Sequence, residues 1–174
     1  VLDHFEAGDI LVLQNEINCL DYVIDRAYEK QMTIILNPSP YDSGLDSCDL
    51  TKVSVFLINE VEGRQISGYA EPQKILDVMR EKFPASKIVL TLGGDGSVYA
   101  DGEQQIRQPI YKVKAVDTTA AGDTFTGFFV AGLVKGLPMK EGLDLCAKAA
   151  AIAVSRKGAV ASIPTMDEVL HTEL

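Results

Sequence analysis

The sequence predicts an α/β fold with a mainly parallel sheet, and two observations carry this prediction. Four short apolar runs are continuous rather than alternating, which is the pattern of strands that are covered on both faces. Between them lie helical patterns over 17–30 and 73–83, where apolar residues recur at three- and four-residue spacing. Strands that alternate with helices indicate right-handed βαβ crossovers and therefore parallel neighbours. The predicted strands are 9–14, 33–37, 53–58 and 87–92.

The alternation of strands and helices ends after Leu92. The stretch "GGDG" and the segments that follow it predict a turn and short antiparallel excursions. Two helices, 122–136 and 139–156, then follow, and Gly136 and Pro138 separate them. The small residues of "CAKAAAIAV" permit the second helix to approach a neighbour closely.

Composition excludes several classes of function. The 174 residues are 47% apolar, which is enough for one globular core. A net charge of −9 disfavours nucleic-acid and anionic-membrane partners, because the overall field repels phosphate. No uninterrupted apolar span of membrane length and no signal peptide is present, so we expect neither membrane insertion nor secretion.

The cysteines and histidines offer no catalytic cluster. Three cysteines without close spacing indicate reduced thiols and a cytoplasmic protein. His4 and His171 lie near opposite ends of the chain, so neither a histidine metal site nor a Ser-His-Asp triad is expected. Because Val1 is not an initiator and a core strand follows within ten residues, we expect an N-terminal part to be missing.

The stretch "AVDTTAAGDTFTG" combines small residues with an acid at the start of a helix. If the helix begins near Gly122, its first amides are unpaired, and the small residues Ala120, Ala121 and Gly122 leave them open to a phosphoryl oxygen. Asp123 beside this anion hole stays ionised and can take a proton from an attacking hydroxyl. The alternative is that Asp123 only caps its helix.

Two further motifs lie at strand ends, where open α/β sheets bind ligands. "TLGGDG" (91–96) either runs along a ligand or is simply a tight hairpin turn. "NEVE" (59–62) is either a capping box or an acid that holds Mg²⁺ through water. No G-x-G-x-x-G or G-x-x-x-x-G-K-[ST] pattern occurs in a suitable place, which argues against oxidoreductases and P-loop proteins.

These three motifs occur in an order that resembles the C-terminal portion of PfkB-type carbohydrate kinases and, within that family, the ribokinases. "DTTAAGDTFTG" resembles the second signature of the family, "NEVE" its N-x-x-E magnesium motif and "TLGGDG" its nucleotide-binding glycine loop. "LVLQNEI", "ILNPSP" and "SRKGAVASIP" are similar to ribokinase segments as well. The resemblance implies a ribokinase-like three-layer α/β/α fold that lacks its N-terminal part and its β-sheet lid, with 1–174 as a single nucleotide-binding portion.

The resemblance also implies an activity, the transfer of the γ-phosphate of ATP to a primary hydroxyl of ribose or a related small sugar. Asp123 would be the general base, and the amides of Ala120, Ala121, Gly122 and Asp123 would form the anion hole. Asn59 would contact the ATP phosphates, Glu62 would organise hydrated Mg²⁺, and Glu16 would touch the sugar. Thr91, Leu92, Gly93, Gly94, Asp95, Gly96 and Ala147 would lie along the nucleotide.

In ribokinase-like enzymes a monovalent cation, usually K⁺, lies behind the anion hole. The resemblance implies that Asp117 is a ligand of this cation and not a second base. The matching positions are Asp117, Thr119, Ala153, Arg156, Gly158 and Ser162.

Several departures qualify the resemblance. Ala120 stands where many family members have Gly, which favours ribokinase over fructokinase. Ala147 stands where an Asn or His often lies near adenine. The missing N-terminal part would supply most sugar contacts and a lid through which the whole protein would form a homodimer, so we expect this portion alone to be inactive.

Two alternatives remain open. In the first alternative to a sugar kinase, the chain is a non-catalytic nucleotide-binding module of the same fold. In the second, it is a different α/β enzyme in which the motifs are fortuitous.

Overall fold

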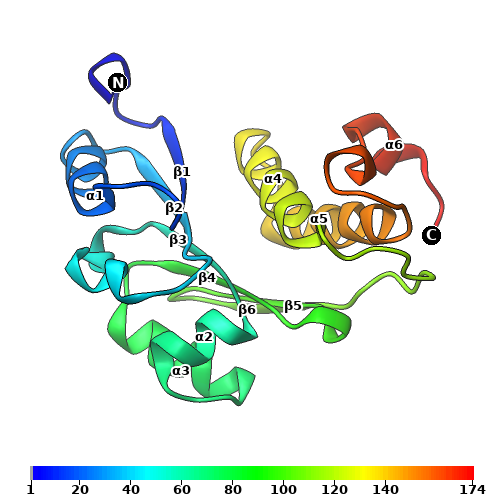
Figure 1. Ribbon diagram of the computed structural model, residues 1–174, viewed down its shortest axis with the longest axis horizontal. Coiled ribbons are helices and arrows are strands. Elements are labelled where there is room, and N and C mark those ends of the chain that lie inside the picture. The colour runs from blue at the N-terminus through cyan, green and yellow to red at the C-terminus, as the bar shows by residue number, and fades with distance from the viewer. Residues whose placement is uncertain (1) are drawn as a thin grey trace. The chain divides into compact units, whose positions relative to one another are not determined.

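The structure is a computed structural model that describes residues 2–174. The chain forms two compact units (Figure 1). The first unit contains the residues up to Leu92 and Val98–Gln105, and the second contains Gly93–Ser97 and Ile106–Leu174. The prediction of one nucleotide-binding portion over 1–174 stays a prediction.

A mainly parallel sheet dominates the first unit, as predicted. Among residues 2–174, the strands follow one another across the sheet in chain order, from β1 to β6. The first four pair in parallel and run over β1 (Ile10–Gln14), β2 (Thr33–Asn37), β3 (Val55–Asn59) and β4 (Lys87–Thr91). β5 (Ser97–Ala100) and β6 (Gln105–Gln108) complete the sheet after the glycine turn.

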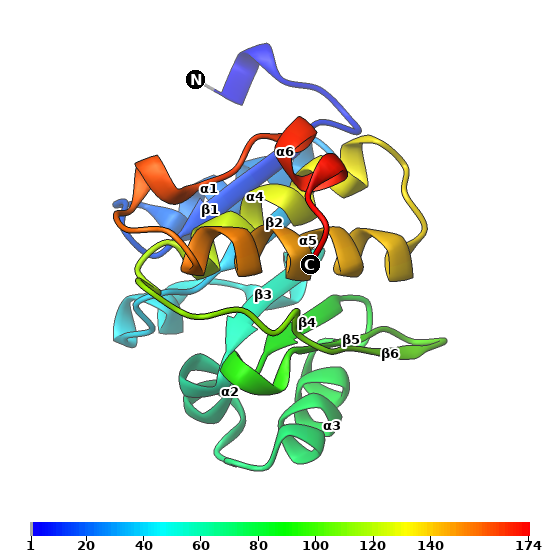
Figure 2. The same ribbon diagram turned by 90° about the vertical axis from the view of Figure 1, so that its right-hand side faces the viewer.

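The helices of the first unit bury one apolar face against this sheet. They are α1 (Leu20–Glu29), α2 (Glu60–Ser67) and α3 (Pro72–Lys82). Ile24, Ile75 and Met79 from these helices are fully buried and join Phe56 and Ile88 of the strands in one core. Each such side chain contributes about 1.5–3 kcal/mol by its removal from water. Figures 1 and 2 show α2 and α3 side by side.

The second unit contains α4 (Ala121–Val134), α5 (Met139–Val154) and α6 (Met166–His171). Helices α4 and α5 pack against each other and are joined by a short turn in which Gly136 has φ +66°. A Cβ built at Gly132 of α4 would lie 3.6 Å from the Cα of Gly142 in α5. Gly132 and Gly142 therefore allow the two helices to approach closely, at a place outside the run of small residues, 146–154, from which a close approach was predicted.

The helix boundaries differ from the predictions by a few residues. α1 begins at Leu20 rather than 17, because Cys19 takes a left-handed conformation with φ 60° before it. α6 was not predicted, and it starts with a capping box in which Thr165 and Glu168 each accept the other's backbone amide. Short 3₁₀ turns occupy Leu2–His4, Ser43–Ser47, Leu50–Lys52, Gly93–Asp95 and Val160–Ser162. Within residues 2–174 no helix has the length and apolar character to cross a membrane.

Candidate active site

In the first unit, the candidate residues gather at the carboxyl edge of the sheet. Asn59 is the last residue of β3 and is in register with Thr91, the last residue of β4. Because these strands are parallel neighbours, the two residues lie side by side, about 4.8 Å apart across the sheet. The polar ends of the "NEVE" strand and of the strand before the glycine turn therefore share one edge.

Asn59 and Glu62 form a complete capping box at the start of α2. Oδ1 of Asn59 accepts from the amides of Val61 at 2.8 Å and Glu62 at 3.1 Å. The Glu62 carboxylate accepts in return from the Asn59 amide at 2.8 Å and from Asn59 Nδ2 at 2.9 Å. The structural interpretation of "NEVE" is confirmed.

This geometry also limits how Glu62 can act on a cation. Its side chain is only 4% exposed, and each carboxylate oxygen already accepts one hydrogen bond from Asn59. Such a carboxylate fits an indirect role, because Mg²⁺ retains several of its waters and binds many carboxylates only through them. Asn59 is exposed at the strand end and keeps one amide hydrogen for a ligand.

The other first-unit candidates differ in exposure. Glu16 is exposed and lies two residues beyond the end of β1, at the same carboxyl edge. Thr91 is half-buried. Leu92 is 6% exposed and belongs to the hydrophobic core, so only its main chain is available to a ligand.

In the second unit, the glycine turn is a 3₁₀ turn over Gly93–Asp95 that closes at Gly96. The Gly96 amide donates to the Gly93 carbonyl oxygen at 3.3 Å. Gly93 and Gly96 have φ +50° and +90°, which residues with a Cβ adopt only under strain. Around Gly94 no atom lies within 4 Å of an added Cβ, so this part of the turn is open.

The predicted anion hole is at the first turn of α4. Ala120 is the N-cap and has no polar side chain, so it offers no side-chain cap to the amides that follow. Gly122 is exposed, and no atom lies within 4 Å of where its Cβ would be. Within residues 2–174 its amide has no hydrogen-bond acceptor, so both this donor and the positive end of the helix are accessible to an anion.

One amide of the predicted anion hole is already engaged. The Ala121 amide donates to the Thr118 carbonyl oxygen at 3.2 Å. Asp123 is the third residue of the helix, is exposed and stands in the first turn, where the helix dipole favours its charge. The N-cap position belongs to Ala120 and not to Asp123.

In the second unit, hydrogen bonds join the two segments that carry the predicted cation-binding residues. The amides of Val116 and Asp117 donate to the Val154 carbonyl oxygen at 2.7 and 3.2 Å. The Gly158 amide donates to Asp117 Oδ2 at 3.0 Å. These bonds join the segment before α4, which carries Asp117 and Thr119, to the end of α5 and the segment after it, which carry the other predicted ligands Ala153, Arg156, Gly158 and Ser162.

Asp117 is held as an anion. Its Oδ1 accepts from Thr119 Oγ1 at 2.6 Å and from the Thr119 amide at 3.0 Å. These bonds, with that from the Gly158 amide, hold the pKa of Asp117 below its ordinary value. Asp117 therefore remains charged at neutral pH, as a cation ligand requires. The guanidinium of Arg156 pairs with Glu168 at 2.8 Å, which leaves its main chain for a cation.

Ala147 lies on α5 and is half-buried. Its methyl group can offer a base only apolar contact. Sequence reasoning missed three other residues near this helix face, Gln108, Tyr111 and Asp144, which are joined by hydrogen bonds. No motif could have found them, because 36 residues separate the first from the last.

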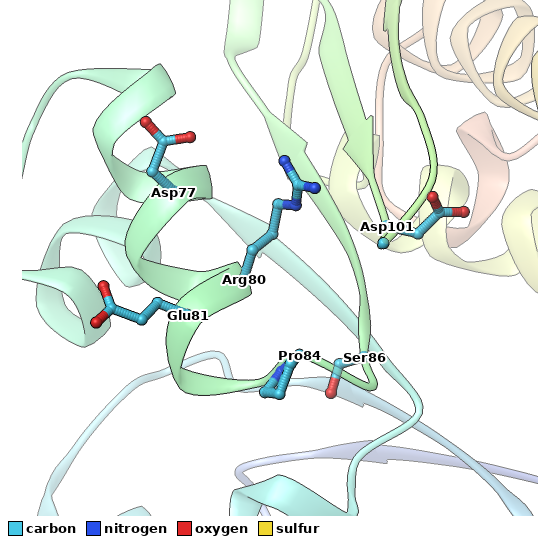
Figure 3. Close-up of a pocket in the computed structure, with 7 residues that line it drawn as sticks. Asp77, Arg80, Glu81, Pro84, Ser86 and Asp101 are labelled. Atoms are coloured by element: carbon cyan, nitrogen blue, oxygen red, sulfur yellow. The ribbon is translucent and has the colours of Figure 1, made fainter.

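A hollow in the first unit lies at a different place (Figure 3). It has a volume of about 350 Å³ and lies between α3 and the β5–β6 connection, and Ser86 in its wall directly precedes β4. This is the amino end of the strand, whereas Asn59 and Thr91 are at the carboxyl end. Figure 3 shows the carboxylates of Asp77 and Glu81 pointing away from Arg80. None of the predicted site residues lines it.

Comparison with known proteins decides the family. The sequence profile of the pfkB family carbohydrate kinases matches residues 3–166, which is most of the chain. The chain belongs to the pfkB family of carbohydrate kinases. The predicted family and the predicted ribokinase-like α/β fold are thereby confirmed.

The relatives of the chain include ribokinases from several organisms. The chain is 36% identical over 173 residues to the ribokinase of Schizosaccharomyces pombe, an alignment that covers 92% of this chain and 54% of that protein. The crystal structure of Thermotoga maritima ribokinase has a TM-score of 0.77 and 31% identity, covering 93% of this chain and 55% of its own.

A structure of Arabidopsis thaliana ribokinase in complex with ribose and ATP has a TM-score of 0.79 and 29% identity. It covers 92% of this chain and 54% of its own chain. The pfkB chain described here thus spans about half the length of the ribokinases that it matches.

Proposed function

We propose that this pfkB family chain is the nucleotide-binding and catalytic portion of an ATP-dependent sugar kinase. The reaction transfers the γ-phosphate of ATP to a primary hydroxyl of ribose or a related small sugar. Membership of the family and the likeness to the Arabidopsis thaliana ribokinase, which was solved with ribose and ATP, support the proposal.

The single observation that carries the proposal is the start of α4. An exposed Gly122 amide, which has no acceptor in the described part of the chain, is combined with an exposed acid one residue later. The amide and the helix dipole can stabilise charge that develops on a transferring phosphoryl group, and Asp123 can accept the proton of the sugar hydroxyl. The proposed anion hole contains Ala120, Ala121, Gly122 and Asp123, and in it the Ala121 amide must leave Thr118 before it can donate to the phosphoryl group.

The remaining residues bind the nucleotide and its ions. We assign Asn59 to the ATP phosphates and Glu62 to waters of a bound Mg²⁺, which would offset phosphate charge. The turn Thr91–Gly96 and Ala147 lie along the nucleotide, and Glu16 contacts the sugar. When bound, K⁺ supplies positive charge behind the anion hole, held by Asp117 and Thr119 and by the main chain of the 153–162 segment.

The cellular compartment and the oligomeric state are proposed from the sequence. We place the reaction in the cytoplasm, because the three cysteines are free thiols in the described chain. The homodimer predicted through a lid would involve segments outside this sequence and remains a prediction.

Replacing the proposed general base, Asp123, separates catalysis from nucleotide binding. We expect Asp123→Asn to lower phosphoryl transfer by about 10²- to 10⁴-fold while MgATP binding is largely retained. Transfer is assayed on this chain and on the product of the whole open reading frame, because the relatives are about twice as long. Asp167→Asn, an exposed acid of α6, is the matched control. Unchanged turnover in Asp123→Asn would refute the assigned role.

The alternative is a nucleotide-binding module of the same fold without catalysis. Ala147 favours this alternative, because its side chain cannot hydrogen-bond to the base of a nucleotide. Calorimetric binding of MgATP by the whole gene product, without transfer to any of a panel of small sugars, would support the alternative.

A further inference from the structure

A carboxylate on α5 binds the last residue of β6 and the segment that follows it. Asp144 Oδ1 accepts from Gln108 Nε2 at 3.1 Å and from the hydroxyl of Tyr111 at 2.9 Å. We call Gln108, Tyr111 and Asp144 the α5 brace. All three residues belong to the second unit, so their mutual arrangement is defined within one compact body.

The glycine turn packs against the backbone of Gln108 in the α5 brace. A Cβ built at Gly96 would lie 2.1 Å from the carbonyl oxygen of Gln108 and 3.0 Å from Cα of Pro109. The backbone of the turn therefore rests directly on the residue whose side chain Asp144 holds. Gln108 is only 8% exposed, so it cannot move without repacking its surroundings.

The same helix carries the residue predicted to face the nucleotide base. Asp144 precedes Ala147 by three residues, and residues at this spacing lie on one face of a helix. The α5 brace thus connects this face to the Gly93–Gly96 turn through two hydrogen bonds and one backbone contact. Because Ala147 cannot hydrogen-bond to a base, binding depends more strongly on the correct separation of the two surfaces.

We propose that Asp144 is a positioning residue for nucleotide binding, which acts by fixing the glycine turn relative to the exposed face of α5. This inference rests on the proposed function, since it assigns the two surfaces to the nucleotide. Asp144 itself does not contact the nucleotide in this role. Two donors converge on one anionic oxygen, and hydrogen bonds to charged groups are among the stronger ones in proteins.

Three substitutions and one control test the α5 brace. Asp144→Ala removes the acceptor, Asp144→Asn keeps an acceptor oxygen in the same place, and Tyr111→Phe removes one of the two donors. Glu141→Ala, an exposed acid in the first turn of the same helix, is the control. Circular dichroism and thermal unfolding establish that each variant is folded.

Two measurements on this chain test separately whether Asp144 orders the glycine turn and whether it strengthens nucleotide binding. Hydrogen exchange without nucleotide reports on the turn, and we expect faster exchange at the Gly96 amide in Asp144→Ala. Calorimetry with MgATP reports on binding, and we expect a Kd about tenfold higher in Asp144→Ala, intermediate values in Tyr111→Phe and in Asp144→Asn, which keeps the acceptor but loses its charge, and a nearly wild-type value in Glu141→Ala.

The outcomes separate the two proposals. A wild-type chain and whole gene product that bind no MgATP would overturn the proposed function itself. If the wild type binds but Asp144→Ala binds equally well, or binds less without a change at Gly96, the positioning role is wrong. An Asp144→Asn variant as weak as Asp144→Ala would also overturn it. Should Asp144→Ala fail to fold, Tyr111→Phe decides by the same two readouts.

Discussion

Gly122 and Gly96 both belong to the candidate site, yet an added methyl group would meet opposite surroundings at the two positions. At Gly96 the Cβ would lie 2.1 Å from a backbone oxygen, and φ is +90°. At Gly122, in the first turn of α4, the Cβ would meet no atom within 4 Å. The fold therefore requires glycine at position 96, whereas it leaves space for a side chain at position 122.

This contrast predicts a variant that is well folded but impaired. We expect Gly122→Ala to leave the free energy of unfolding unchanged or to raise it by up to about 1 kcal/mol, because Ala favours helix over Gly. Phosphoryl transfer should nevertheless fall by at least tenfold, since the methyl group obstructs the approach of the phosphoryl oxygen to the amide. Urea unfolding and initial-rate kinetics measure the two quantities.

Gly127 provides the matched control for this substitution. It lies in the same helix, is exposed and also has open space around an added Cβ. Gly127→Ala should therefore show the same effect on stability and no loss of transfer. If both variants lose transfer equally, or if neither does, the Gly122 amide is not part of an anion hole.

At the scale of elements, α2 shows how one local motif can serve both folding and a site. Its capping box connects the end of β3 to the first turn of the helix through four hydrogen bonds between Asn59 and its neighbours. The exposed side of Asn59 faces outward at the carboxyl edge, while Glu62 is nearly buried. The two interpretations of "NEVE" are therefore compatible.

The α2 cap predicts a stability effect that does not depend on any ligand. We expect Asn59→Ala to lower the free energy of unfolding by about 1–3 kcal/mol. Loss of the cap contributes about 0.5–2 kcal/mol, and the buried Glu62 carboxylate loses a donor. Urea unfolding at neutral pH measures the effect. The control Glu60→Gln changes an exposed first-turn acid and should cost less than about 0.5 kcal/mol. Equal effects would contradict the role of the cap.

The elements also show what the sequence could predict. The strands were located to within about two residues, because continuous apolar runs such as "TIILN" and "KIVLTL" have no competing helical period. The start of α1 was missed because the left-handed conformation of Cys19 has no signature in a residue that is not Gly or Asn. α6 was missed because six residues are too few for a periodic pattern.

The candidate residues were found for a different reason. The motifs at 59–62, 91–96 and 117–123 are contiguous, so local sequence determines their backbone. Asp117 and Gly158 are 41 residues apart, and only the resemblance to a family brought them together before the structure did. The α5 brace had neither a motif nor a resemblance, and long-range hydrogen bonds of this kind cannot be deduced from one sequence.

At the scale of the whole molecule, a chain of net charge −9 is proposed to bind a polyanionic nucleotide. The overall field opposes such a ligand, so binding requires positive potential that is local to the site. The start of α4 supplies a helix dipole, but Mg²⁺ would neutralise far more charge than one helix end. Affinity for ATP should therefore depend strongly on the divalent ion.

This balance of charge leads to a prediction about stability. A ligand at 100 times its Kd stabilises the folded state by about 2.7 kcal/mol. For a chain of this size we expect MgATP to raise the Tm by about 5–10 °C. ATP with a chelator, or MgCl₂ alone, should raise it much less, because neither provides both the nucleotide and its neutralising charge. Differential scanning fluorimetry compares the three conditions at one ionic strength, since screening alone alters the repulsion. An equal shift with and without Mg²⁺ would show that the protein's own groups suffice, and that Glu62 has no part in organising a cation.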